Sequence, residues 1–287
     1  MRKEQSQIAL PNPWIVFTFE ALMFSLTLAL GILAGWRLRQ LVQSNTIGLT
    51  PVSVWQLFFS FVVATLALLL VAYFLKFQRP KRIFFKIILW GTVILGNLFF
   101  WSLWLSDGLI LVLTAILVWA LIKKPFIWVY NLAIIFAAAG VASSLGIQLT
   151  PLLVCLMMLV FSIYDFVAVH LTGHMIKMAK EMVNQQVVIG LVIPKTIQEF
   201  KSPIKEIQQE GKFMILGGGD VVFPLLLAIS CLSINIWSSV LVAAFSLVGL
   251  LAVFLIFINQ KERRPLPALP PIALVSIVGY FITTLLW

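Results

Sequence analysis

The sequence has 287 residues, of which 62% are hydrophobic and only 10% are charged. Soluble domains are nearer half apolar and a quarter charged, so this composition excludes an ordinary soluble enzyme or binding domain. The net charge of +10 predicts no nucleic-acid partner, because the Lys and Arg residues gather in a few loops, as they do in oriented membrane proteins.

Apolar runs long enough to cross a bilayer recur along the whole chain, and the alternating segments of a β-barrel are absent. The predicted fold is therefore an all-α, polytopic bundle of about nine transmembrane helices. Cys155 and Cys231 both lie inside apolar runs, which indicates neither a disulfide framework nor a zinc site. The first run is longer than a signal-peptide core, which favours a retained anchor. The predicted spans are 14–35, 52–75, 83–104, 108–122, 126–147, 151–172, 213–232, 234–258 and 267–287.

The positive charges give the predicted orientation. With nine spans, 18 Lys and Arg residues lie on the side of the N-terminus, and only Arg37 and Arg39 lie on the other side. Because positive loops stay in the cytoplasm, we expect a cytoplasmic N-terminus and an extracellular C-terminus.

One connection is long, and it divides the chain into 1–172, 173–212 and 213–287. Met175, Met178, Met182 and Val183 recur at helical spacing in its first half and predict an amphipathic helix at the interface. The outer half is expected to be a solvated loop. Within the connection, 187–193 is a short β-branched run that ends at a proline and is strand-like in composition.

Two acids lie inside predicted spans, where an ionised carboxylate is costly and usually functional. Asp165 lies seven residues before the inner end of its span, and Asp220 seven residues into the next, which is expected to start as a helix at 213. Both are therefore ~10 Å below the cytoplasmic boundary. Such neighbouring acids can share one proton, so that a carboxylate activates water while the acid protonates a peptide carbonyl. A structural pair, or the proton relay of a transporter or channel, is the alternative.

A third feature opens the last span. Arg264 to Pro271 contains four prolines, which predict non-helical backbone at membrane depth, where it is tolerated beside a cavity. The alternative is a proline-rich first turn of a helix.

These segments resemble a known family. Tyr164-Asp165, Gly217-Gly218-Gly219-Asp220 and Pro267-Ala268-Leu269 match, in order, the YD, GxGD and PAL motifs of the presenilin and signal peptide peptidase family. The sequence looks particularly like archaeal presenilin homologues. GxGD alone would be weak, since prepilin peptidases share it, but the three motifs lie on the expected spans.

The resemblance implies an intramembrane aspartyl protease that is active as a single intact chain without metal or organic cofactor. Asp165 and Asp220 would be catalytic, and Tyr164, the three glycines and the PAL residues would contact substrate. Partners would be transmembrane proteins or peptides and membrane lipids, in the plasma membrane of a prokaryote, with oligomerisation left open. Presenilins and signal peptide peptidases have opposite orientations. The orientation predicted here is the presenilin one, with substrates whose N-terminus is outside. An unwound substrate could add as a strand along 187–193 or 265–271.

Other ionisable residues give weaker indications. His170 and His174 have the i, i+4 spacing of a zinc protease, but Leu171 occupies the position of its glutamate. Glu20 is either a protonated residue at the membrane interface, which is the favoured interpretation, or part of a water path to the acids. Asp107 is expected in a solvated outer turn.

Overall fold

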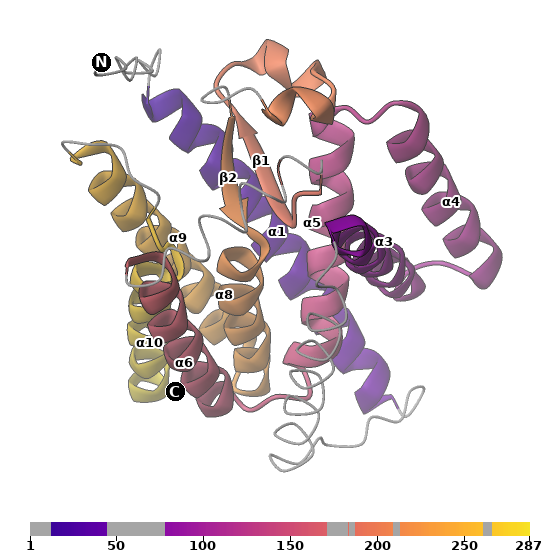
Figure 1. The fold of residues 1–287 in the computed structure, drawn as a ribbon. Helices are drawn as coiled ribbons and strands as arrows, with labels where there is room; N and C mark the ends of the chain where they lie inside the picture. Colours follow the sequence, from indigo (N-terminus) through magenta and orange to yellow (C-terminus); the bar gives the residue numbers. More distant parts are fainter. Residues whose placement is uncertain (1–12, 45–77, 171–182, 184–186, 209–212, 261–265) are drawn as a thin grey trace.

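The computed structural model describes residues 13–44, 78–170, 183, 187–208, 213–260 and 266–287. Within these ranges the protein is mostly helical, and one small two-stranded sheet lies among the helices near one end (Figure 1). In chain order the elements are α1 (Pro13–Gln43), α3 (Gln78–Ser102), α4 (Asp107–Lys123), α5 (Ile127–Gly146), α6 (Pro151–His170), β1 (Gly190–Pro194), the 3-10 helices η1 (Ile197–Lys201) and η2 (Ile204–Gln208), β2 (Phe213–Gly217), α8 (Gly218–Ser230), the 3-10 turn η3 (Cys231–Ser233), α9 (Ile236–Ile258) and α10 (Leu269–Leu286).

Six described helices are long and apolar enough to cross a membrane: α1, α3, α5, α6, α9 and α10. The polytopic helical membrane fold is thus confirmed. The predicted spans at 108–122 and 213–232 correspond to shorter helices, α4 with 17 residues and α8 with 13. The predicted span at 52–75 lies outside the described residues, as does most of the amphipathic helix expected after α6.

The first helix has one apolar face that is exposed and another that is buried against the protein. Leu22, Leu26 and Leu33 are exposed on α1, while Phe24 and Leu28 between them are buried against the protein. An exposed face this apolar is suited to lipid rather than water. The helix continues to Gln43, beyond the predicted end at 35, because basic side chains at a membrane boundary can remain helical while their charged ends reach water.

The start of the predicted seventh span is wrong. Residues Phe213–Gly217 form β2 rather than helix, and they pair antiparallel with β1 from Gly190↔Gly217 to Pro194↔Phe213. A short apolar run has no periodicity that distinguishes a strand from a buried helix. Its partner strand decides the outcome, and the strand-like character predicted for 187–193 is confirmed at Gly190–Pro194.

Helix α5 anchors the sheet through side chains on its N-terminal half. The Asn131 amide donates to the Val192 carbonyl (2.7 Å) and accepts from the Val192 N–H (2.9 Å). The Tyr130 hydroxyl donates to the carbonyl of Val188. The outer edge of β1 is therefore closed by α5, and β2 forms the other edge of the sheet.

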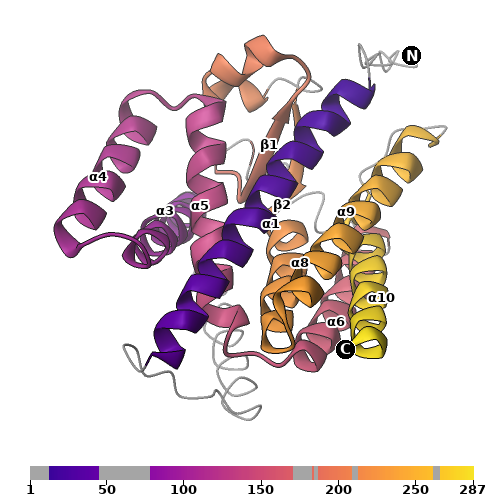
Figure 2. The same cartoon turned by 180° about the vertical axis from the view of Figure 1, so that it is seen from behind.

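The C-terminal helices α9 and α10 lie side by side next to α6 and α8 (Figure 2). Small residues allow this close approach: Ser246 and Ser276 are hydrogen-bonded at 2.8 Å, and a Cβ on Gly249 would lie 2.7 Å from the Cα of Ile272. Such contacts are typical of helix association in membranes. They fix the start of α10 against the helices that carry the two aspartates.

Candidate active site

Helix α6 holds Asp165 on its protein-facing side. Ser162, Asp165 and Ala168 recur at three-residue spacing, and all three are buried. Asp165 is only 5% exposed, yet neither of its carboxylate oxygens, nor the Ser162 hydroxyl, makes a hydrogen bond of ordinary geometry within the described residues. Buried polar atoms are normally paired, so this face of α6 is suited to receive a polar group.

Helix α8 places Asp220 in its first turn, directly after β2. The Gly217 N–H interacts with the Asp220 carboxylate. A Cβ on Gly217 would lie only 2.8 Å from Oδ2 of Asp220. Glycine at this position is therefore a steric requirement, since any side chain would displace the carboxylate. The Gly218 N–H instead continues the sheet and donates to the Ile189 carbonyl at 3.0 Å.

The two aspartates lie together between α6 and α8. They are near enough for the charge of Asp165 to act on Asp220. The rings of Phe161 and Phe223 stack between the same two helices, with centroids 4.7 Å apart. Phe161 lies one turn before Asp165, and Phe223 about one turn after Asp220. This contact therefore holds the two acids at a common depth, as the sequence predicts.

The proline-rich segment supplies a backbone donor. Residues 266–268 are non-helical, but α10 already begins at Leu269. The expected non-helical stretch up to 271 is therefore too long, because Pro270 and Pro271 fit the first turn of a helix. These prolines have no N–H, and the Ile272 N–H donates to the Ala268 carbonyl at 3.5 Å. The Leu269 N–H remains, and it interacts with the Asp165 carboxylate.

The other predicted site residues are placed unevenly. Pro267 and Leu269 are buried and Ala268 is half-buried, whereas Gly219 is exposed, and a Cβ there would lie 3.7 Å from the Phe223 ring. Tyr164 is 62% exposed and does not join the buried cluster. Sequence reasoning missed the N–H groups of Gly217 and Leu269, because backbone donors carry no residue signature. It also missed the Ser162 hydroxyl, because a single serine in an apolar span does not by itself indicate a site.

Glu20 lies inside the protein. It is only 7% exposed, on the buried face of α1, and its charge acts on Asp220. Asp107 is exposed, as expected.

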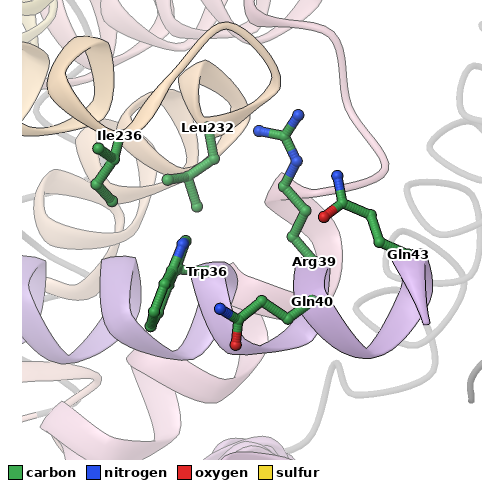
Figure 3. A pocket seen from close by; sticks show the side chains of 6 residues that line it. All are labelled: Trp36, Arg39, Gln40, Gln43, Leu232 and Ile236. Carbon is green, nitrogen blue, oxygen red and sulfur yellow. The ribbon is translucent and has the colours of Figure 1, made fainter.

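A pocket of ≈ 240 Å³ lies near the C-terminal end of α1, many residues after Glu20. It is lined by Trp36, Arg39, Gln40, Gln43, Leu232 and Ile236, and it contains none of the acids (Figure 3). Arg39 there donates to the Ser233 carbonyl at 3.4 Å. No group of three or more His, Cys, Asp or Glu side chains with metal-binding geometry occurs in the described part of the chain.

Comparison with known proteins identifies the family and the fold. A family model described as signal-peptide peptidase, presenilin aspartyl protease matches residues 51–287. Among curated proteins no match is found. A solved presenilin family intramembrane aspartate protease in space group C222 aligns with a TM-score of 0.61 and 22% identity, over 96% of this chain and 100% of that chain. Another, in space group P2, aligns with a TM-score of 0.59 and 25% identity, over 93% and 96%.

The family match covers all three motifs and most of the chain, so it decides between the protease and the transporter that the sequence alone left open. The chain belongs to the signal-peptide peptidase and presenilin family and is an intramembrane aspartyl protease.

Proposed function

We propose that Asp165 and Asp220 are the catalytic pair of this protease. The observation that carries the proposal is their placement: two acids from different helices lie close enough for the charge of Asp165 to act on Asp220, and each interacts with a backbone N–H near the start of a helix. Two carboxyls at such a site share a proton, because both cannot ionise together.

In the proposed reaction one carboxylate takes a proton from water while the protonated partner donates to the oxygen of the peptide carbonyl. The resulting hydroxide adds to the carbonyl carbon and gives a neutral gem-diol. Collapse of the diol breaks the C–N bond as the amine nitrogen is protonated, and the pair again holds one proton. The N–H groups of Gly217 and Leu269 each act on one of the two carboxylates and favour its charged form. Water is the only co-reactant, and no cofactor is proposed.

The substrate is proposed to add as a strand to β2. In an antiparallel pair, residues alternate between facing the partner and facing away. Gly218 bonds to Ile189, and Val192 bonds outward to α5. The backbone groups of Phe213, Ile215 and Gly217 should therefore face away from β1. This argues against 187–193 as the accepting edge, because α5 closes it.

Removing the backbone donor of Ile215 tests this edge. The substitution Ile215→Pro deletes an N–H that faces away from β1, so the β1–β2 ladder should survive, as prolines are tolerated on edge strands. We expect kcat/KM to fall about tenfold, mainly through KM, because one hydrogen bond of about 1.4 kcal/mol is lost. Cleavage of a transmembrane peptide by the purified protein, with new termini identified by mass spectrometry, measures the effect.

Two control variants accompany this experiment. Ile215→Val keeps both the N–H and the 42%-exposed apolar surface, and should behave as wild type. Leu216→Pro removes a donor that faces β1 and should instead reduce the melting temperature. Unchanged KM in the Ile215→Pro variant would exclude strand addition at β2.

The proposed topology has nine spans, a cytoplasmic N-terminus and both catalytic residues in the cytoplasmic third of the membrane. The excess of 18 positive residues against 2 supports this orientation. The same proposal divides the chain at 173–212 and places the protein in the plasma membrane of a prokaryote. It also assigns substrate contacts to Tyr164, Gly218, Gly219 and Pro267-Ala268-Leu269.

A preferred substrate direction follows from this topology. An active site is chiral, so it accepts a peptide backbone in one N-to-C direction. Segments with an outside N-terminus should be cut toward the inner leaflet, and inverted segments should be cut at least tenfold more slowly, because a reversed strand loses more than one backbone hydrogen bond. The measurement uses one reporter segment in both orientations, set by flanking Lys residues. Equal cleavage, or preference for an inside N-terminus, would refute the proposed direction.

A further inference from the structure

Glu20 is a buried acid for which the proposed reaction has no use. It lies in the middle of an apolar stretch of α1, on the face that also buries Val16, Phe24 and Thr27. Intramembrane acids are expensive to retain. Its position therefore needs an explanation that the catalytic pair alone does not provide.

Two close contacts give the register of α1 against α8. A Cβ on Gly31 would lie 2.6 Å from Leu225, and a Cβ on Gly35 would lie 2.8 Å from Ile229. Gly35 follows Gly31 by about one helical turn, and Ile229 follows Leu225 by the same interval, so the two helices run parallel. At ~1.5 Å per residue, Glu20 lies ~16 Å before Gly31, and Asp220 lies ~7.5 Å before Leu225. Glu20 is thus ~9 Å from the level of Asp220, on the side of β2.

A neighbouring ring contact supports this level. Phe19 packs against Phe200 of η1 with centroids 5.2 Å apart, so this part of α1 lies beside the connection that carries the sheet. Glu20 is therefore between Asp220 and the end of the molecule formed by η1 and β1.

The charges around Glu20 leave Asp220 as its main electrostatic partner. Within the described residues, α5, α9 and β1, which pack against α1, have no charged side chains. Two neutral polar side chains of α5, Tyr130 and Asn131, donate to the carbonyls of Val188 and Val192. On η1, Lys201 is exposed, and the Glu199 carboxylate accepts from the N–H groups of Lys195 and Thr196. Asp220 is within range of the Glu20 charge.

We propose that Glu20 is a third carboxyl of the active site, a positioning residue that acts through Asp220 to keep the shared proton on the catalytic pair at higher pH. This inference rests on the proposed roles of Asp165 and Asp220. Above the pH at which Glu20 ionises, its negative charge opposes loss of that proton. At lower pH Glu20 is neutral and has no such effect.

The two limbs of the pH profile separate this role from a structural one. A pair that shares one proton gives a bell-shaped profile. In Glu20→Gln the alkaline limb should move to lower pH by about one unit, the size expected for two charges on the order of 10 Å apart at an intermediate dielectric. The acid limb should stay in place. Glu20→Asp, which retains the carboxyl, should restore the alkaline limb.

The experiment measures kcat and kcat/KM against pH for wild type, Glu20→Gln, Glu20→Met and Glu20→Asp. Thr27→Val is the matched control, because it changes a buried polar residue on the same face of α1 without removing charge, and both its limbs should coincide with wild type. Binding of a hydroxyl-containing transition-state isostere over the same pH range gives a second readout. Glu20→Met keeps the test falsifiable if Glu20→Gln does not fold.

Coincident profiles for wild type and the neutral variants, or equal displacement of both limbs, would overturn the role of Glu20. Failure of the catalytic assignment has a different signature, namely cleavage by Asp220→Asn.

Discussion

Replacing either aspartate with asparagine, as Asp165→Asn or Asp220→Asn, is expected to abolish proteolysis while leaving the protein folded. Asparagine has nearly the same shape but cannot take a proton from water or share one with its neighbour. Acid–base assistance is typically worth 10²–10⁴-fold, so loss of the shared proton should reduce kcat by more than about 10³-fold. Cleavage of a transmembrane peptide by the purified variants, followed by mass spectrometry, measures this loss.

The pair also predicts how the two substitutions combine. Because the aspartates act as one unit, the double variant should be no worse than either single variant. Helical content and melting temperature should remain near those of wild type, since Asp165 makes no full hydrogen bond within the described residues that asparagine would break. Near-normal cleavage by either single variant would disprove the assignment.

A methyl group at Gly217 should reduce activity almost as strongly. In Gly217→Ala the new Cβ would lie 2.8 Å from Oδ2 of Asp220, so the carboxylate must move away from its backbone N–H partner. Displacement of a catalytic group by about 1 Å can cost 10²-fold. We expect kcat to fall by about that factor, as measured with the same peptide.

The matched control for this variant is Gly91→Ala in α3, where a Cβ would meet no described atom within 4 Å. It should retain full activity, and the slight gain in helix propensity should leave its melting temperature unchanged or raised. Wild-type kcat in Gly217→Ala would mean that Asp220 does not need its observed position.

The common depth of the two acids could be predicted because it depends on local sequence. The common depth of Asp165 and Asp220 follows from counting residues along neighbouring apolar runs, and the Phe161–Phe223 contact agrees with that count. Strand β2 could not be predicted, because the choice between strand and helix at 213–217 depends on pairing with 190–194.

Two other features depend on tertiary contacts that the chain does not encode locally. Helix α1 is apolar on nearly all sides, so its sequence cannot show that Glu20 lies on the protein-facing side. The Leu269 side chain indicated a site contact, yet the group that faces Asp165 is the backbone N–H. The structure identifies that donor because it shows that α10 begins at Leu269 and that the prolines after Leu269 have no N–H to donate.

The amide of Asn131 has a consequence for how copies of the protein coexist in a crowded membrane. By donating to and accepting from Val192, it occupies the outward backbone groups at the centre of β1, which another strand would use. An open strand edge is a template for association between molecules. With Val192 occupied, a second copy cannot form a regular ladder with β1, and further pairing is left to the edge of β2. With strand addition at β2 as proposed, each molecule would take up a single unwound segment at a time.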